Sequence, residues 1–455
     1  MLRQYQIDIL EKSRSLMAQG VKSICIQSPT GSGKTVLSAH MIKSALALNN
    51  RIWFLTHRRE LIKQVFDCFT AEKINCGIVC SGFFSEPLWP VQICSVQSLS
   101  RRMDKLQSPN LIIYDECHHI AANSWKQIHS KNPSAFHIGL SATPQRLDGK
   151  GLSDFFDKMV EGPTIQWLIA NGYLSDYRIY KPSRFTMDGV KIKMGEFDRV
   201  ETERRVNTFS IVGDVVSEYQ KKALGKRTIV FCHSVNHSIQ TANAFNGAGI
   251  SAVHIGADTP EEERISNFEK FKKGEILVLT NVDIAGEGVD VPAVECVILL
   301  RPTNSTALYL QQVGRGLRPS PGKKETIILD HVGNYLLHGL PDMVRQWKLE
   351  GNKPAANRDV YKNTLMLCPK CFSAQLRANK CKYCDAFIEH KERSTKIKYE
   401  AGELIEVNKD QARIQMPQWS AKTIEDLARV GRARGYAHPE KWAAHVIAYR
   451  NRKAQ

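Results

Sequence analysis

The sequence contains no long hydrophobic run, which restricts what the protein can be. No apolar stretch approaches the ~20 residues that a helix needs to cross a bilayer. The first residues, Met1-Leu2-Arg3-Gln4-Tyr5, also lack the basic-then-apolar order of a signal peptide. These absences predict a cytoplasmic protein without a membrane partner. Its 12 cysteines are then expected to be reduced unless they bind metal.

Most of the cysteines do not belong to a CxxC pair. Eight occur singly in apolar stretches, and we interpret them as small core residues. They are Cys25, Cys68, Cys76, Cys80, Cys94, Cys117, Cys232 and Cys296.

Acidic residues are outnumbered by basic ones. The chain has 63 Lys and Arg against 46 Asp and Glu, a formal net charge of +17, so a polyanion such as nucleic acid is the expected partner. A soluble protein that is merely basic remains an alternative on charge alone. A length of 455 residues with 42% hydrophobic residues indicates two or three globular domains.

Short apolar runs alternate with helical stretches twice along the chain. Buried strands that lack polar alternation are typical of parallel sheets covered on both faces, so we predict two tandem α/β domains. The runs are 24–26, 52–55, 93–96, 111–114 and 137–140, then 228–231, 252–255, 276–279, 297–300 and 326–329.

The domain boundaries follow from where this alternation starts and stops. We predict a first α/β domain over 1–177 and a second over 207–335. A polar connector over 178–206, a linker over 336–362, a cysteine-containing module over 363–390 and a basic, partly helical tail over 391–455 account for the rest.

A phosphate-binding loop follows the first strand. The octet over 28–35 contains glycines that let successive N–H groups face one anion, and a helix start adds partial positive charge. Lys34 is expected to reach the β- and γ-phosphates, and Thr35 to ligate Mg²⁺. Ser28 departs from the usual glycine at that position. The other predicted nucleotide contacts of the loop are Thr30, Gly31, Ser32 and Gly33.

An acidic pair follows the strand over 111–114. Ligands bind at the carboxyl edge of parallel sheets, so Asp115 is expected to hold Mg²⁺ and Glu116 to polarise the attacking water. Together with the loop, this pair predicts an NTPase. A solvated loop with a chance acidic pair is the alternative.

Further motifs narrow the class. Ser141-Ala142-Thr143 follows a strand, Gly286 to Asp290 lies in the second domain, and Gln311 to Arg318 is predicted on a helix. Arg315 and Arg318 are three apart and could point together into a cleft, as arginine fingers do. Taken alone, this octet fits a solvated basic helix face equally well.

In this order the motifs resemble the DEAD/DEAH-box helicases of superfamily 2 in the DECH form. Within them the chain is similar to the RadD-like and type III restriction-subunit-like branch. The resemblance covers about residues 1–335 and implies two RecA-like domains. It rests on Arg3-Gln4-Tyr5-Gln6, the loop over 28–35, 56–61, 115–118, 141–143, 286–290 and 311–318.

The resemblance also implies roles for matching residues. Arg3, Tyr5 and Gln6 would contact adenine and make ATP the nucleotide, and Gly288 and Asp290 would contact the cleft or ribose. His118, Ser141, Ala142 and Thr143 would couple hydrolysis to nucleic-acid grip. Gln311, Arg315 and Arg318 would act on the transition state, and Thr56, Arg58, Ser95 and Gln97 would contact the nucleic-acid backbone.

Two CxxC pairs follow the second domain. Cys368, Cys371, Cys381 and Cys384 have the spacing of a tetrahedral Zn²⁺ site in a zinc-ribbon-like module. Coincidental pairs or a redox dithiol are the alternatives. The aromatics around the module could contact nucleic acid or form its small core, and the tail could pack on the motor or bind a partner.

The predicted function is an ATP-dependent DNA helicase or translocase, in DNA repair or replication with a possible protein partner. An RNA-acting enzyme of the same fold and an ATP-gated nucleic-acid clamp are the alternatives. No nuclease carboxylate cluster is evident in the sequence.

Overall fold

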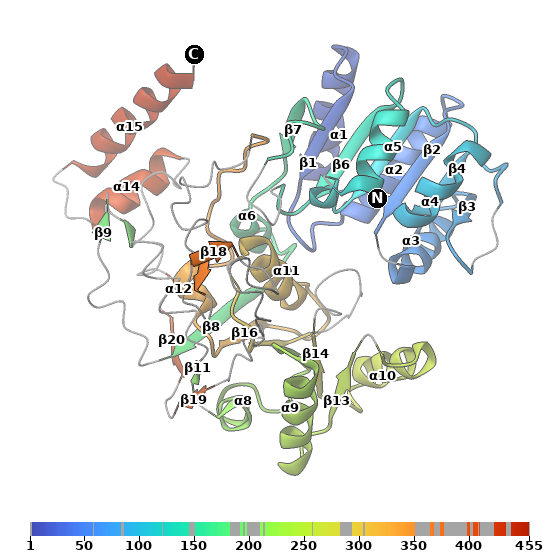
Figure 1. Ribbon diagram of the computed structural model, residues 1–455. Helices are drawn as coiled ribbons and strands as arrows, with labels where there is room; N and C mark the ends of the chain where they lie inside the picture. Colours follow the sequence, from blue (N-terminus) through green and yellow to red (C-terminus); the bar gives the residue numbers. More distant parts are fainter. Residues whose placement is uncertain are drawn as a thin grey trace.

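A computed structural model of the chain shows two α/β lobes built on parallel sheets (Figure 1). It describes residues 2–57, 59–82, 86–120, 122–144, 151–182, 192–193, 196–197, 210–212, 214–256, 258–282, 294–303, 305–350, 365–367, 374–376, 398–400, 404–407, 409, 423–433 and 438–454. Among these residues, no helix is both long and apolar enough to cross a membrane.

The first lobe has a seven-stranded parallel sheet in the order β3-β4-β2-β5-β6-β1-β7. Its strands are β1 Ser23–Gln27, β2 Ile52–Thr56, β3 Cys76–Val79, β4 Val91–Ser95, β5 Leu111–Asp115, β6 Phe136–Ser141 and β7 Lys158–Glu161. Its helices are α1 Gln4–Ala18, α2 Lys34–Leu46, α3 Arg59–Ala71, α4 Val96–Arg102, α5 Asn123–Lys131 and α6 Ile165–Ala170, with 3-10 turns at Met103–Lys105 and Cys117–His119.

The second lobe also has a seven-stranded sheet, in the order β13-β14-β12-β15-β16-β8-β20, in which all strands but the edge strand β20 are parallel. Its strands are β8 Asp176–Pro182, β12 Thr228–Phe231, β13 Ala252–Ile255, β14 Val278–Asn281, β15 Cys296–Leu299, β16 Glu325–Asp330 and β20 Leu404–Glu406. Its helices are α8 Val215–Ala223, α9 Val235–Gly247, α10 Glu261–Lys273, α11 Thr306–Gly316 and α12 Asn334–His338.

Short elements complete the described chain. Two-stranded pairs join β9 Ile192–Lys193 to β10 Glu196–Phe197, β11 Ser210–Val212 to β19 Lys398–Glu400, and β17 Leu365–Leu367 to β18 Ala374–Leu376. The tail contains α14 Ile424–Ala433 and α15 Pro439–Ala454, which pack together through Leu427, Ala428 and Ala443.

Apolar strands form the core, as the sequence predicts. The strands β1, β2 and β4 are buried along their whole length because helices cover both faces of the sheet. All ten predicted strands are present, although Val96 begins α4 instead of ending β4. Seven of the eight single cysteines are buried, and Cys68 is half-buried.

The predicted boundary between the first domain and the connector is wrong. It falls between residues 177 and 178, within β8, and β8 pairs with β16 in the second sheet. The strand β20 comes from the predicted tail, yet it pairs antiparallel with β8 and extends the same sheet. The second lobe therefore includes segments from both sides of its predicted limits.

Candidate active site

The phosphate loop joins β1 to α2 and is held by its own serines. Gly31 and Gly33 have φ of +83° and +81°, a left-handed conformation that glycine adopts without strain. The Ser28 Oγ lies 2.6 Å from the Ser32 Oγ, which donates to the Pro29 carbonyl at 2.7 Å. A serine at position 28 therefore fits the loop, because its hydroxyl joins the two ends of the turn.

The acidic pair lies at the same sheet edge as the loop. Asp115 ends β5, and Glu116 follows it with φ of +50°, a conformation that is uncommon outside glycine. The Lys34 Nζ lies 4.0 Å from the Glu116 Oε1 and donates to the Ser28 carbonyl at 3.3 Å. The turn thus aims the Glu116 carboxylate at the loop lysine.

The predicted coupling residues are brought together beside Glu116. The His118 Nδ1 lies 3.4 Å from the Glu116 Oε2 and 3.1 Å from the Ser141 Oγ. The Ser141 Oγ also accepts the Thr143 backbone N–H at 3.1 Å. A chain of polar contacts therefore connects the acidic pair to the end of β6.

Side chains at the start of α1 form hydrogen bonds with the phosphate loop. The Tyr5 hydroxyl and the Gln6 Nε2 both donate to the Ser32 carbonyl, at 2.7 and 3.2 Å. The Arg3 guanidinium donates to the Tyr5 hydroxyl at 3.2 Å and lies 4.6 Å over the Tyr173 ring. These predicted adenine-contacting residues thus also hold the loop.

Two aromatic residues beside this element were not predicted from the sequence. The Tyr5 ring meets Trp167 and Tyr173 edge to face, with centroids 5.9 and 5.4 Å away. Trp167 is 42% exposed, so the cluster reaches the surface. Trp167 and Tyr173 are six positions apart around α6, and no sequence motif links them to Tyr5.

The helix α11 of the second lobe lies directly on the phosphate loop. A Cβ added at Gly314 would lie 2.8 Å from the Thr30 Cβ, and one at Gly31 would lie 3.6 Å from the Arg318 Cγ. Gln311 and Arg315 on this helix are buried. The structure therefore brings α11 and Arg318 of the second lobe to the first-lobe loop.

One detail of the prediction is corrected. Arg318 is not on the helix, because α11 ends at Gly316 and Leu317 caps it. Pro319 disfavours a helical conformation for the residue before it, which explains the early end. Arg318 therefore extends from a loop beside the helix that carries Arg315.

Three of the four predicted backbone-contact residues lie at one sheet edge. Thr56 and Ser95 are paired positions at the ends of the neighbouring strands β2 and β4. The Ser95 Oγ accepts the Ser98 N–H at 3.2 Å and caps α4, and Gln97 on that helix is exposed. Arg58, Gly288, Asp290 and the cysteines 368, 371, 381 and 384 lie outside the described residues.

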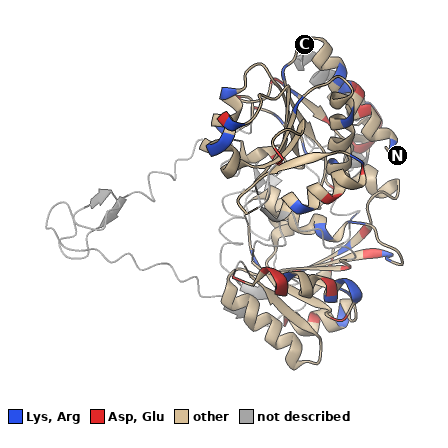
Figure 2. Ribbon diagram, turned by 90° about the vertical axis from the view of Figure 1, so that its right-hand side faces the viewer, with Lys and Arg blue, Asp and Glu red and all other residues tan. Residues whose placement is uncertain are grey.

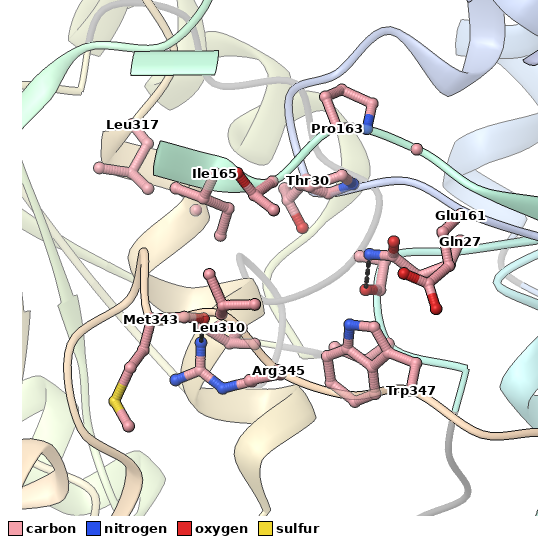
Figure 3. A pocket seen from close by; sticks show the side chains of 17 residues that line it. Gln27, Thr30, Glu161, Pro163, Ile165, Leu310, Leu317, Met343, Arg345 and Trp347 are labelled. Carbon is pink, nitrogen blue, oxygen red and sulfur yellow. Dashed lines mark hydrogen bonds between the residues drawn. The ribbon is translucent and has the colours of Figure 1, made fainter. Parts of the chain in front are cut away.

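A pocket between the lobes opens beside the phosphate loop (Figure 3). Thr30 and Thr143 line it from the first lobe, and Leu310 from α11. The segment over 343–347 closes it, with Arg345 and Trp347 facing the space. This segment lies within the predicted linker over 336–362.

The segment that closes the pocket is anchored in both lobes. The Arg345 guanidinium donates to the carbonyls of Pro341, Met343, His338 and Leu340. Leu349 is buried in the core of the first lobe, and its carbonyl accepts the backbone N–H groups of Leu152 and Ser153, at 2.5 and 2.9 Å. The chain after the second lobe thus returns to the first.

The close fit of α11 on the loop gives a direct test. Gly314→Ala adds a methyl group where only 2.8 Å separates it from Thr30, while alanine favours the helix itself. We expect kcat for ATP hydrolysis to fall ~10-fold or more through misplacement of the two lobes, with no loss of thermal stability. Gly247→Ala at the end of α9, where the added carbon meets nothing within 4 Å, is the matched control and should keep full activity. Equal rates for the two variants would contradict the close contact.

Comparisons with known proteins agree with this geometry. A family profile described as "Type III restriction enzyme, res subunit" matches residues 1–146, and one described as "Helicase conserved C-terminal domain" matches residues 208–320. A 51.5 kDa protein of a Lactococcus phage (isolate 7-9) is 37% identical over 394 residues, which cover 86% of this chain and 84% of the phage protein.

Two more distant likenesses cover a similar part of the chain. The Saccharomyces cerevisiae protein named as ATP-dependent helicase IRC3 is 33% identical over 363 residues, 73% of this chain and 51% of its own length. A fragment of an HsdR subunit of a type I restriction enzyme from Vibrio vulnificus YJ016 has a TM-score of 0.59 and 24% identity, and covers 75% of this chain and 66% of that one. This chain therefore spans most of the phage protein but about half of the yeast relative, and the solved structure shows a shared fold.

Proposed function

Because the chain belongs to the superfamily 2 helicases of the type III restriction-subunit branch, a group of ATP-hydrolysing enzymes, we propose that it couples ATP hydrolysis to movement on DNA or to its remodelling. The observation that carries the proposal is α11 of the second lobe lying on the phosphate loop of the first, with Gly314 against Thr30. A site shared between two lobes can convert hydrolysis into relative motion of those lobes.

The first lobe would supply the groups that bind the phosphates and activate the attacking water. The Thr35 hydroxyl and the Asp115 carboxylate are hard oxygen donors that suit Mg²⁺, which neutralises phosphate charge when it is bound. Lys34 would bind the β- and γ-phosphates. Glu116 would orient the attacking water and accept its proton.

The second lobe supplies positive charge to the transition state. Arg315 and Arg318 would neutralise charge that develops on the γ-phosphoryl oxygens, with Gln311 beside them. Gln311 is buried, and its Nε2 has no hydrogen-bond acceptor in the described residues, so its amide is available to a γ-phosphate or water.

Nucleic acid would lie across both lobes and be held mainly by its backbone. Thr56, Ser95 and Gln97 at one sheet edge are the described candidates in the first lobe. After residue 350 the sequence has 21 Lys and Arg against 11 Asp and Glu, so a net +10 of the total +17 falls in the C-terminal part. Figure 2 shows basic and acidic residues interspersed over both lobes, so the basic C-terminal part would add attraction to the contacts made by the lobes. Such binding is expected to tolerate sequence and weaken with salt.

DNA is the preferred substrate in this proposal. The first-lobe profile and the Vibrio structure are both named for restriction enzymes, a class that acts on DNA. A role in DNA repair or replication is part of the same proposal. An RNA-acting enzyme and an ATP-gated clamp that does not move along its strand are the competing functions.

The ATPase rate with different activators tests these functions. We expect single-stranded or forked DNA to stimulate hydrolysis well above the rate without nucleic acid. Stimulation by RNA alone would overturn the substrate, and stimulation by DNA without unwinding of a labelled fork would favour the clamp. No stimulation by any of them would contradict nucleic-acid coupling by this chain.

Zinc binding by the cysteines at 368, 371, 381 and 384 is proposed on their spacing. The strands β17 and β18 flank the first pair in sequence and pair antiparallel, as the arms of a small ribbon would. Metal analysis of the purified protein is expected to find about one zinc ion per chain. The double variant Cys381→Ser with Cys384→Ser should lose it, whereas Cys68→Ser should not. Equal metal content in the three proteins would sink this site.

A further inference from the structure

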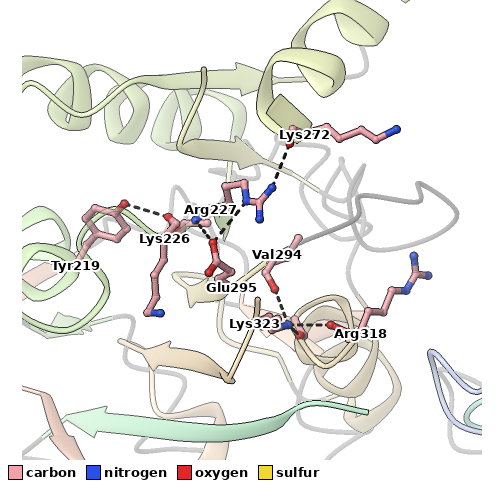
Figure 4. A network of polar contacts seen from close by, with 10 residues as sticks. Tyr219, Lys226, Arg227, Lys272, Val294, Glu295, Arg318 and Lys323 are labelled. Atoms are coloured by element: carbon pink, nitrogen blue, oxygen red, sulfur yellow. Dashed lines mark hydrogen bonds and ion pairs between the residues drawn. The ribbon is translucent and has the colours of Figure 1, made fainter. Parts of the chain in front are cut away.

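Lys323 lies in the turn between α11 and β16, and its ammonium group sits among main-chain carbonyls (Figure 4). The Lys323 Nζ donates to the carbonyls of Val294 and Arg318, at 2.7 and 2.9 Å, and to that of Gly316. Gly322, with φ of +78°, makes the turn that folds the lysine back onto the helix end. These contacts place one cation at the C-terminus of α11.

The carbonyls at this helix end have few other donors. The last carbonyls of a helix lack intrahelical partners, and burial leaves them dependent on side chains. Besides Lys323, the Thr326 Oγ1 donates to the Gly316 carbonyl at 2.7 Å, and the Ser175 Oγ lies 3.4 Å from the Arg318 carbonyl. A positive charge is also favourable at the negative end of the helix dipole.

The network joins the catalytic helix to the rest of the second sheet. Val294 lies two residues before β15, so Lys323 ties the end of α11 to the segment that enters that strand. The Arg318 side chain extends away from Lys323 in Figure 4, and its Cγ lies near Gly31 of the phosphate loop. The main chain that Lys323 holds is therefore the main chain from which Arg318 reaches the loop.

We propose that Lys323 is a positioning residue for ATP hydrolysis, which fixes the main chain at Gly316 and Arg318 so that Arg315 and Arg318 are aimed at the phosphates. The inference rests on the proposed function, in which DNA stimulates ATP hydrolysis at this site. Lys323 acts through the main-chain carbonyls of Gly316 and Arg318.

The hydrogen bonds of Lys323 depend on pH, because its ammonium group titrates. Burial lowers the pKa of Lys323 to about 8; Glu295 beside it opposes this shift, and Lys226 and Arg227 add to it. An ammonium group has three N–H donors for three carbonyls, whereas a neutral amine has two. The network therefore loses a hydrogen bond as the pH rises through about 8.

The free energy of unfolding should rise with pH over this range, although the network loses a hydrogen bond. Because the folded pKa lies below the ordinary value of 10.5, the unfolded chain binds more protons between about pH 8 and 10.5. This group's contribution to stability consequently rises with pH over that range. A fall in kcat there, without a fall in stability from this group, separates positioning from unfolding.

The test compares Lys323→Met with the adjacent, exposed Lys324→Met in DNA-stimulated ATP hydrolysis. We expect Lys323→Met to lower kcat ~10- to 100-fold, with KM for ATP nearly unchanged, and Lys324→Met to keep wild-type values. The wild-type kcat should decline above about pH 8, and Lys323→Met should lack this step. Lys323→Arg, which stays charged, should restore part of kcat and shift the decline to higher pH.

Thermal unfolding accompanies each assay. If Lys323→Met does not fold, Thr326→Val removes the second donor to the Gly316 carbonyl and should lower kcat with KM kept. A Lys323→Met enzyme with kcat within about twofold of wild type and an unchanged pH profile overturns the inference. Lys34→Ala is measured in parallel. If Lys34→Ala is inactive and Lys323→Met is active, only the positioning role is contradicted. If both variants are active, ATP hydrolysis at this site is contradicted.

Discussion

Glu116→Gln is expected to lower ATP turnover by ~10³-fold while ATP binding is retained. Glutamine is as large as glutamate and no harder to place in the left-handed backbone conformation of residue 116, but its amide cannot accept a proton. The contacts that aim the carboxylate, Lys34 at 4.0 Å and His118 at 3.4 Å, place it at the phosphate loop. The change therefore removes a proton acceptor and leaves the surface that binds the nucleotide.

The measurement pairs steady-state ATPase rates with equilibrium binding of a fluorescent ATP analogue. Glu72→Gln is the control, because Glu72 is an acidic residue of the same lobe that pairs with Lys43 at the surface. It should leave both quantities unchanged. A Glu116→Gln enzyme that turns over near the wild-type rate would show that another group activates the water.

The strands could be predicted because each is a continuous apolar run. Parallel strands buried on both faces need no polar alternation, so the ten runs are distinct in the sequence. The strand β8, by contrast, alternates charged and apolar residues and reads as part of a polar connector. The strand β20 reaches the same sheet from more than 200 residues along the chain, and no local pattern indicates such a pairing.

The first-lobe site could be predicted for a similar reason. The phosphate loop and the acidic pair are short motifs whose chemistry depends on neighbouring residues, and the structure places Lys34 and Glu116 together. The fit of Gly314 on Thr30, the cation at Lys323 and the return of Leu349 to the first lobe join distant segments. They depend on the tertiary packing of both lobes, which the sequence patterns do not encode locally.

Arg318→Ala is expected to lower kcat by ~10³-fold with a much smaller effect on KM for ATP. Arg318 leaves the end of α11 beside Gly31, where its guanidinium can meet charge that grows on the γ-phosphoryl group during transfer. Lysine at this position would restore only part of the rate, because it is a point charge without the planar fork of arginine. Arg178→Ala, which removes an arginine paired with Glu325 at the surface, should keep the wild-type rate.

Binding of ADP with aluminium fluoride, which mimics the transferring phosphoryl group, separates this role from ground-state binding. Arg318→Ala should weaken that complex far more than it weakens ATP binding, and equal weakening of both would contradict a transition-state role. Mixing Arg318→Ala with Glu116→Gln gives a second discrimination. Because the structure places both groups in one chain, the mixture should remain inactive, whereas recovered activity would mean that one chain supplies Glu116 and another supplies Arg318.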